Sequence, residues 1–202
     1  MKAYTKNHLR NYIWDSLIDK NLYIPPKLPY GRIPNFKGST AAAELLRSTP
    51  EWNNSKTIFS SPDSAQKKVR EFALKDKKLL IMASPKLKKG YLLIKPDNVE
   101  GNEKSASTIN GAFKFGESIN KFPLVDLVVE GSVAVDMHGN RLGKGGGYGD
   151  VEIQHLFNGK SIKNSTPIVT TVHEIQIIDK VPIEAHDKPI NMIVTPKRVI
   201  RL

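Results

Sequence analysis

The chain has 202 residues, of which 39% are hydrophobic and 25% charged, an ordinary composition for a globular protein long enough to bury its own core. It contains no cysteine, which excludes thiol catalysis, cysteine-ligated zinc and iron–sulfur clusters. Its formal net charge of +11 permits an anionic partner.

The beginning of the chain, Met1–Arg10, is polar and basic and lacks the apolar run of a signal peptide. No stretch of the sequence approaches the roughly 20 apolar residues that a membrane span needs. We therefore expect a cytoplasmic protein without membrane contact. Because no linker or internal repeat divides the sequence, we predict a single domain over residues 1–202.

In chain order, the sequence predicts a first helix, capped by Thr5 and running to about Asn21. Four prolines then keep Tyr23–Gly38 out of regular structure. Further helices are predicted at Ser39–Arg47, Asp63–Lys75, Asn110–Phe115 and Gly147–Phe157. Strands are predicted at Thr57–Ser60, Lys78–Ala83, Tyr91–Ile94, Val125–Glu130, Val133–Asp136, Ile168–Val172, Glu174–Ile178, Met192–Thr195 and Val199–Arg201.

This alternation of strands and helices predicts the fold class. Strands separated by helices of this length form right-handed βαβ units. The expected fold is α/β, with an open, mostly parallel, Rossmann-like sheet flanked by helices. Val125–Val129 supports it, because Asp126 is the one polar residue in a run typical of a buried strand.

Nine of the basic residues lie in the stretch Lys67–Lys89, against only Glu71 and Asp76. We interpret this stretch as a solvated helix face and loop. The alternative is a surface that binds a polyanion such as RNA, but the interleaved aromatic residues of a single-strand binder are missing there.

The densest cluster of glycines is the run Gly139–Asp150, which holds six of the fourteen in twelve residues. Successive exposed N–H groups, followed by a helix, form an anion-binding nest. Arg141 and Lys144 add formal positive charge where phosphate would lie. The run matches neither a Walker A motif nor a Rossmann fingerprint, and composition alone also allows a flexible surface turn.

Two residues of the run favour a phosphate site. Tyr148 and Asp150 have no use in a flexible turn. Asp150 offers the oxygen ligands that Mg²⁺ prefers. On spacing alone, a carboxylate that stabilises the start of the following helix is an equally good interpretation of Asp150.

Several segments resemble the 5-formyltetrahydrofolate cyclo-ligases, also called methenyltetrahydrofolate synthetases. Val125–Leu127, Gly131–Asp136 and Gly139–Asp150 resemble the signature of that family, and Val181–Asp187 with Ile193–Thr195 is similar to its closing segment. Lys6 and Arg10 match its N-terminal Lys-x-x-x-Arg pair. Arg32–Gly38 resembles the branch of methenyltetrahydrofolate synthetase domain-containing proteins.

The resemblance implies a fold similar to the sugar-phosphate isomerase and CoA-transferase group. It also implies an ATP- and Mg²⁺-dependent ligase that closes 5-formyltetrahydrofolate, or a related pterin, to the 5,10-methenyl form. Lys6, Arg10, Arg141 and Lys144 would then neutralise phosphate charge in catalysis. The nucleotide would contact Gly143, Lys144, Gly145, Gly146, Gly147 and Tyr148, and Asp150 with Asp187 would hold the metal. Without the resemblance, Lys6 and Arg10 are a solvated helix face and Asp187 closes a loop.

Three features depart from the family pattern. Glu130 stands where the family commonly has proline, and Gly149 replaces the second of two adjacent tyrosines. Tyr23–Gly38 replaces a region that contacts folate in standard members. We therefore expect the nucleotide half of the site to be retained and leave the second substrate open between 5-formyltetrahydrofolate and another pterin.

The five histidines show no i, i+4 pairing or His-x-His spacing, so we expect no zinc site, and we interpret His186 as a surface residue. The alternative function is a non-catalytic nucleotide- or RNA-binding module on the same fold. Nucleic acid is the less favoured partner.

Overall fold

The computed structural model describes residues 5–202; residues 1–4, at the start of the polar N-terminal stretch, lie outside the described part. The α-helices are α1 (Lys6–Asp19), α2 (Ser39–Arg47), α3 (Pro50–Asn54), α4 (Lys67–Lys75), α5 (Glu103–Ala106), α6 (Ile109–Phe115) and α7 (Tyr148–Asn158). The strands are β1 (Thr57–Ser60), β2 (Leu79–Ala83), β3 (Tyr91–Ile94), β4 (Glu117–Ile119), β5 (Leu127–Glu130), β6 (Ala134–Val135), β7 (Arg141–Leu142), β8 (Ile168–Thr171), β9 (Met192–Val194) and β10 (Val199–Arg201).

Eight strands form one sheet in the order β10-β9-β8-β5-β1-β2-β3-β4. The four central pairings, β9 with β8, β8 with β5, β5 with β1 and β1 with β2, are parallel, and the outer three are antiparallel. Strands β6 and β7 form a separate two-stranded antiparallel hairpin. The predicted α/β class with a mostly parallel sheet is therefore confirmed.

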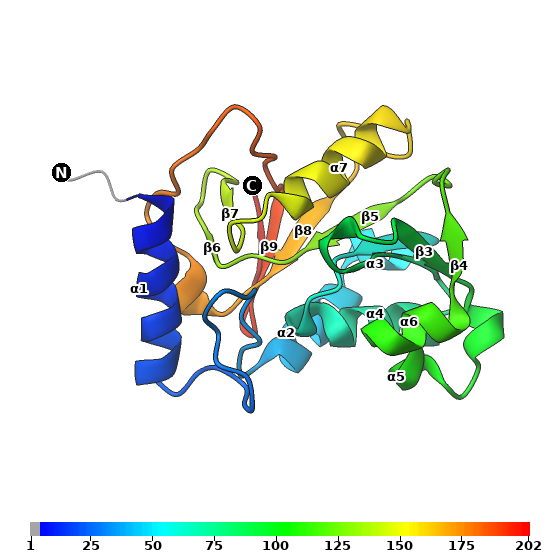
Figure 1. Ribbon diagram of the computed structural model, residues 1–202, viewed down its shortest axis with the longest axis horizontal. Coiled ribbons are helices and arrows are strands. Elements are labelled where there is room, and N and C mark those ends of the chain that lie inside the picture. The colour runs from blue at the N-terminus through cyan, green and yellow to red at the C-terminus, as the bar shows by residue number, and fades with distance from the viewer. Residues whose placement is uncertain (1–4) are drawn as a thin grey trace.

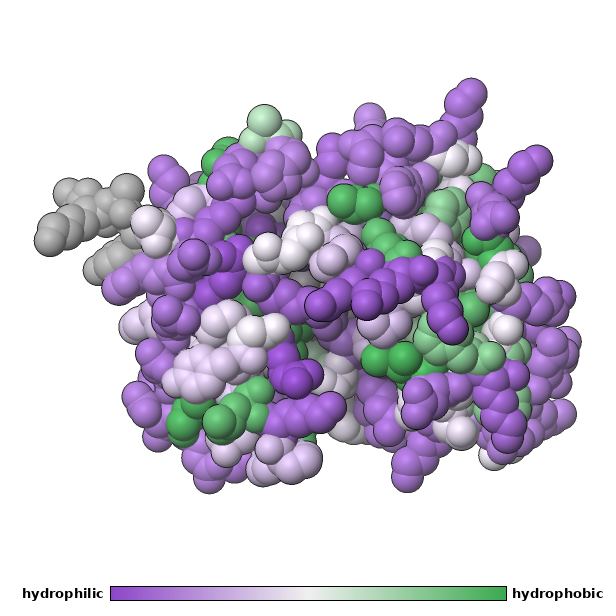
Figure 2. All heavy atoms as spheres, viewed as in Figure 1, coloured by the Kyte–Doolittle hydropathy of each residue, from purple (hydrophilic) through white to green (hydrophobic). Residues whose placement is uncertain are grey.

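Helices cover both faces of the sheet, with α7 on one side and α2 and α4 on the other, while α1 stands at one end beside the β6–β7 hairpin (Figure 1). The core is accordingly divided into two clusters of buried residues. Along β1, Ile58 belongs to the first cluster and Phe59 to the second, as alternating side chains on a strand require. The outer surface in the same view is mainly hydrophilic (Figure 2).

Helix ends follow local chemistry. The Thr5 hydroxyl accepts a hydrogen bond from the N–H of His8 (3.2 Å), which confirms the predicted cap of α1. The helix ends at Asp19 rather than near Asn21, because Asn21 takes a left-handed backbone conformation with φ of 50°. Leu9, Ile13 and Leu17 form its buried face.

The prediction of a strand at Glu174–Ile178 is wrong. Glu174–Gln176 forms a 3₁₀ helix whose start is capped by His173. The buried side-chain amide of Gln176 donates hydrogen bonds to the carbonyls of Ser132 (3.0 Å) and Val133 (3.1 Å). No hydrophobic pattern in the sequence signals these side-chain hydrogen bonds. They outweigh the preference of the isoleucines for a strand.

Two other boundaries move. The predicted helix Asp63–Lys75 is a 3₁₀ turn, Ser64–Gln66, followed by α4. The predicted strand Val133–Asp136 shrinks to β6, since the carboxylate of Asp136 turns the chain by accepting from the N–H groups of His138 (2.9 Å) and Asn140 (3.0 Å).

No helix among residues 5–202 is both long and apolar enough to cross a bilayer.

Candidate functional site

The site lies at the carboxyl ends of β1 and β5. The chain leaves β1 toward β2 on one side of the sheet, and β5 continues toward β8 on the other. In an open parallel sheet, this change of direction leaves a crevice between the two strand ends. Asp63 follows β1, Glu130 is the last residue of β5, and Gly131 comes next, so all three are brought to this crevice.

The glycine run does not form a flexible turn throughout. Its first part, Arg141–Leu142, is strand β7, and its last part starts helix α7. Gly145 and Gly147 have φ of 105° and 68°, values that favour glycine. A Cβ atom on Gly146 would lie 2.6 Å from the ring of Tyr148, so the ring packs directly on the loop backbone. Gly147 caps α7 without a side chain, which leaves the first N–H groups of that helix open to a ligand.

Arg141 fixes the loop to the sheet. Its guanidinium is buried and donates to Asp150 Oδ1 (2.7 Å) and to the carbonyl of Gly131 (3.2 Å). The N–H of Lys188 also donates to Asp150 Oδ1 (3.0 Å). Both of these contacts of Asp150 end on Oδ1.

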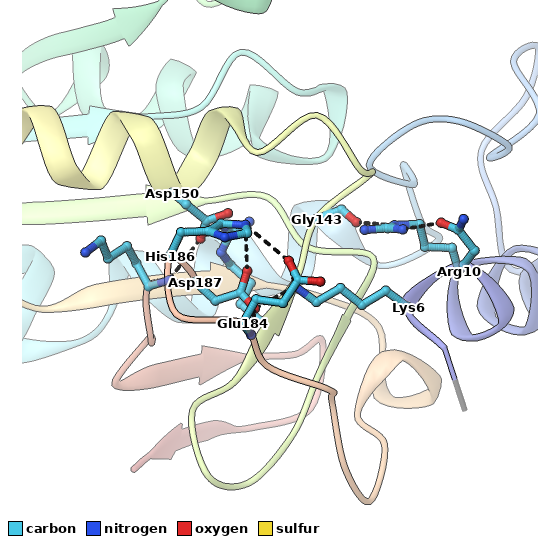
Figure 3. A network of polar contacts seen from close by, with 10 residues as sticks. Lys6, Arg10, Gly143, Asp150, Glu184, His186 and Asp187 are labelled. Carbon is cyan, nitrogen blue, oxygen red and sulfur yellow. Dashed lines mark hydrogen bonds and ion pairs between the residues drawn. The ribbon is translucent and has the colours of Figure 1, made fainter. Parts of the chain in front are cut away.

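The two cations of α1 lie beside the same loop (Figure 3). Arg10 donates from Nε to the carbonyl of Gly143 (2.8 Å). Lys6 lies 2.6 Å from Asp187 and 3.3 Å from Glu184. Burial by itself would raise the pKa of Asp187, but the hydrogen bonds from Lys6 and from the Glu184 N–H, with the charge of Lys6, together outweigh it and lower that pKa. Both helix cations, 133 residues or more from these partners, are thus brought to the glycine loop.

Two clefts adjoin along the glycine loop. One, of about 560 Å³, is lined by the loop, by the ends of β1 and β5, and by part of the proline-rich segment. The other, of about 530 Å³, is lined by the loop, by the start of α1 and by residues 182–187. We call them the sheet cleft and the helix cleft. Arg141, Gly143, Gly147 and Asp150 line both, so the loop is a shared wall between two binding spaces.

The helix cleft holds the groups suited to a metal-bound phosphate. Lys6 and Arg10 offer N–H donors, and Asp150 and Asp187 offer oxygen ligands of the kind that Mg²⁺ binds. Glu184, His186 and Asp187 each place one potential ligand atom within 4.8 Å of the others, although Lys6 already bridges the two acids. The donor set therefore fits a divalent cation. His186 itself is exposed, as expected.

The floor of the sheet cleft carries two buried acids, Glu130 and Glu152, which are 2% and 3% exposed. Burial raises the pKa of both carboxyls. The charge of Glu130 raises the pKa of Glu152 further, while a hydrogen bond from Glu152 acts to lower the pKa of Glu130. Among residues 5–202, neither Glu130 Oε1 nor Glu152 Oε2 has a hydrogen-bond partner. The pair is thus an unsatisfied acceptor site in the wall of the cleft.

Gly149 and Glu130, two departures from the family pattern, are in contact. A Cβ atom on Gly149 would lie 3.1 Å from Glu130 Oε2 and 2.9 Å from Arg141 Nη2. Any larger residue at position 149 would therefore displace Glu130 or Arg141. The glycine makes room for the glutamate, so these two departures form one structural feature.

The third departure, Tyr23–Gly38, reaches the same corner. Ile33 packs against Gly131, since a Cβ there would lie 2.8 Å from Ile33 Cγ2. Trp14 anchors the segment by donating from its indole N–H to the carbonyl of Arg32 (3.1 Å). The predicted irregular segment is thus a wall of the sheet cleft. Across the cleft, Lys144 lies 3.2 Å from Asp63.

Sequence reasoning missed three groups of this site. Arg70 is buried and donates to the carbonyls of Ser61 (2.5 Å), Asp63 (3.0 Å) and Ser107 (2.8 Å), so it holds the loop after β1 in shape. Burial lowers its pKa to about 10. Glu152 lies one turn after Gly149 on α7, and this spacing was the available signal. Glu184 precedes His186 and Asp187 in the closing motif, but the sequence predicted no role for it in the site.

The interpretation of the basic stretch Lys67–Lys89 as a solvated helix face and loop is only partly right. Arg70 and Lys78 are buried, and Lys78 donates to the carbonyl of Ser55 (2.6 Å). Lys68 and Lys75 both pair with Glu71. These charges are used within the fold, which weakens the polyanion alternative.

Comparisons with known proteins place these observations in a family. The model of the 5-formyltetrahydrofolate cyclo-ligase family matches residues 3–196. A methenyltetrahydrofolate synthase domain-containing protein from Bos taurus is 36% identical over 97% of this chain and 53% of its own length. The human protein of the same description is 34% identical over 97% of this chain and 53% of its own. The chain thus spans about half of the length of these curated relatives.

A 5-formyltetrahydrofolate cyclo-ligase from Escherichia coli is 36% identical over 37% of this chain and 38% of its own. The solved structure of 5,10-methenyltetrahydrofolate synthetase from Aquifex aeolicus superposes with a TM-score of 0.61 at 22% identity, covering 97% of this chain and 92% of that one. This likeness supports the fold. Since the family model covers nearly the whole sequence, the chain belongs to the 5-formyltetrahydrofolate cyclo-ligase family.

Proposed function

We propose that the chain is an ATP- and Mg²⁺-dependent ligase that converts 5-formyltetrahydrofolate, or a close pterin relative, to the 5,10-methenyl form. The observation that carries this proposal is the pair of clefts divided by the glycine loop. One cleft offers cations and carboxylates for a metal-bound phosphate, and the other offers a space of about 560 Å³ for a second, ring-shaped substrate. A reaction between two substrates needs both beside one set of groups.

In this proposal the nucleotide phosphates lie in the helix cleft. Lys6, Arg10, Arg141 and Lys144 neutralise their charge, and the N–H groups of Gly143–Gly147 cradle them. Lys144 changes its partner from Asp63 to phosphate when the nucleotide binds. Asp150 and Asp187 hold the Mg²⁺, whose chemistry is to draw charge from the phosphate oxygens. Tyr148 lies between the nucleotide and the pterin.

The pterin occupies the sheet cleft with its formyl group toward the loop. The formyl oxygen attacks the γ-phosphorus of ATP and ADP leaves, which makes the formyl carbon electrophilic. The second nitrogen of the substrate then attacks that carbon and loses its proton, and the oxygen leaves as phosphate. The chain supplies mainly positioning and charge neutralisation for these steps.

The test is to titrate the chain with Mg·ATP by calorimetry and to follow the methenyl product by its absorbance. We expect heat of binding, and product formation that requires both ATP and the formylated substrate. Asp150→Asn and Lys6→Ala should each lower turnover at least about a hundredfold. Glu71→Gln, a buried carboxylate outside both clefts, is the matched control and should turn over normally.

Absence of heat from Mg·ATP would contradict the nucleotide half of the proposal. Heat from the nucleotide with no methenyl product would favour a non-catalytic nucleotide-binding module or a different pterin substrate. RNA binding that falls steeply between low and physiological salt, and survives Asp150→Asn, would identify a nucleic-acid-binding module. We propose the cytoplasm as the compartment, since a cysteine-free chain fits reducing conditions.

A further inference from the structure

Three features that are separate in the sequence meet at one corner of the sheet cleft. Glu130 ends β5, Gly149 is the second residue of α7, and Ile33 comes from the proline-rich segment. Gly149 borders Glu130 Oε2, and Ile33 packs on Gly131, the residue after Glu130. Because each feature makes room for or encloses the glutamate, the corner is built around Glu130.

The corner holds a hydrogen-bonded pair of buried acids and several buried polar atoms that lack a partner among the described residues. Glu130 Oε1 and Glu152 Oε2 are buried and have no hydrogen-bond partner among the described residues. The nearby guanidinium of Arg141 uses Nη1 and Nη2 for the Gly131 carbonyl and for Asp150, and its buried Nε has no partner among the described residues. Buried polar atoms left without a partner are destabilising, so this corner is where a ligand that supplies N–H donors would gain most.

We infer that Glu130, supported by Glu152, is the residue that selects the second substrate, by accepting hydrogen bonds from two adjacent N–H groups on the edge of a flat heterocycle. This inference rests on the proposed function and names the subsite of its second substrate. A carboxylate receives two parallel N–H donors in one plane, which is the arrangement that gives such pairs both strength and direction. The 2-amino group and N3–H of a pterin present such an edge.

The enclosing residues fit this ligand class. Ile33 offers an apolar side chain for a ring to contact, and Tyr148 lines the same cleft. Gly149 carries no side chain, so the ring edge and the two carboxyls can approach each other closely. A ring that presents an acceptor in place of the amino group offers one donor fewer to the Glu130 carboxyl and should bind more weakly.

The experiment measures the affinity of the chain for two matched ligands by calorimetry or fluorescence. Pterin carries the 2-amino group, and lumazine carries a carbonyl at the same position. We expect the wild-type chain to prefer pterin by about tenfold to a hundredfold, as a buried acceptor left without its donor predicts. Glu130→Gln should reduce the preference to less than about threefold, and Glu71→Gln, a buried glutamate outside the cleft, should keep it.

Two further measurements separate recognition from folding. Glu130→Gln should melt no lower than wild type, because it removes an unsatisfied buried acid, whereas a purely structural glutamate would lower the melting temperature when replaced. Gly149→Ala keeps Glu130 but adds a Cβ 2.9 Å from Arg141 Nη2 and 3.1 Å from Glu130 Oε2, and it should weaken pterin binding severalfold while leaving lumazine binding nearly unchanged.

The inference is overturned if wild type binds neither ligand, binds both equally, or keeps its preference in both Glu130→Gln and Gly149→Ala. Mg·ATP affinity is measured on the wild-type chain in parallel. Its loss counts against the proposed function, while intact Mg·ATP binding without discrimination between the rings counts against the role of Glu130 alone.

Discussion

Glu71 on α4 and Glu130 at the end of β5 are both 2% exposed, yet they lie in opposite environments. Glu71 receives Lys68 and Lys75, each at 2.9 Å, from its own helix. Burial by itself would raise the pKa of Glu71, but these lysines outweigh it and lower that pKa. Burial raises the pKa of Glu130, whose neighbour Glu152 is a second acid. Helix α4 therefore pairs its buried acid with its own lysines, while Glu130 and Glu152 in the sheet cleft each keep one carboxyl oxygen without a partner among the described residues.

The largest expected effect is a loss of turnover when Arg141, which lines both clefts, is replaced. Arg141→Lys keeps the positive charge but removes the planar guanidinium, which donates to Asp150 and to the Gly131 carbonyl at the same time. We expect turnover of the formylated folate to fall about a hundredfold to a thousandfold, because both clefts share this wall. Steady-state kinetics measures it, with Glu71→Gln as the variant that should stay near wild type. Equal losses in both variants would show that general stability limits activity.

Arg70 is next to Glu71 on α4 but reaches the sheet cleft, and its loss should have the next largest effect. Arg70→Met keeps the length of the side chain but leaves the carbonyls of Ser61, Asp63 and Ser107 without their donor. We expect a loss of about 3 kcal/mol in the free energy of unfolding, measured by denaturant titration. An unchanged midpoint would mean that the carbonyls find other donors or water.

The two glutamates should respond to pH with opposite signs. The folded-state pKa of Glu71 lies below its unfolded value, so its stabilisation is present above pH about 4.5 and disappears as the pH falls through the folded pKa. The folded-state pKa of Glu130 lies above its unfolded value, so the acid increasingly destabilises the fold as the pH rises above about 4.5.

Glu71→Gln should therefore lose about 1 kcal/mol at pH 7 and little near pH 3, whereas Glu130→Gln should gain stability over wild type as the pH rises. Urea titrations of wild type and both variants across pH 3–8 measure these differences. If the free energies of unfolding of the two variants changed with pH in the same way, the two glutamates would not lie in opposite environments.

The smallest effect should come from an exposed pair near the packed side. Lys77 and Glu100 lie 3.2 Å apart with side chains that are 52% and 79% exposed. Lys77→Ala should change the free energy of unfolding by less than about 0.5 kcal/mol, less still at high salt. A larger loss would show that surface charges on this side contribute more than solvent screening permits.

The sequence predicted the glycine loop and its neighbours well where the signal was local. The glycine content located Gly139–Asp150. Helix α7 was predicted within one residue at each end, because its hydrophobic periodicity and the glycines before it are features of neighbouring residues in the sequence. The site residues nominated from the family motif do adjoin one another in the two clefts. Their roles in phosphate and metal binding stay predictions.

The failures have a common physical cause. Glu174–Ile178 looked like a strand because the buried hydrogen bonds of Gln176 to Ser132 and Val133 carry no signal along the chain. Lys78 and Arg70 looked solvated because the carbonyls that receive them belong to distant loops. Propensity describes how a residue behaves among its neighbours in sequence, not what a partner in space offers it.

Taken by itself, the amino-acid order determined the α/β class, the glycine loop and the kinship of the chain, since periodicity, composition and motif spacing are local properties. Only the tertiary structure decided that Glu130, Gly149 and Ile33 meet at one corner, and that Arg141 joins two clefts. Contacts between positions that are far apart in sequence arise when the sheet brings its strand ends together, and no local pattern records which side chains will face each other there.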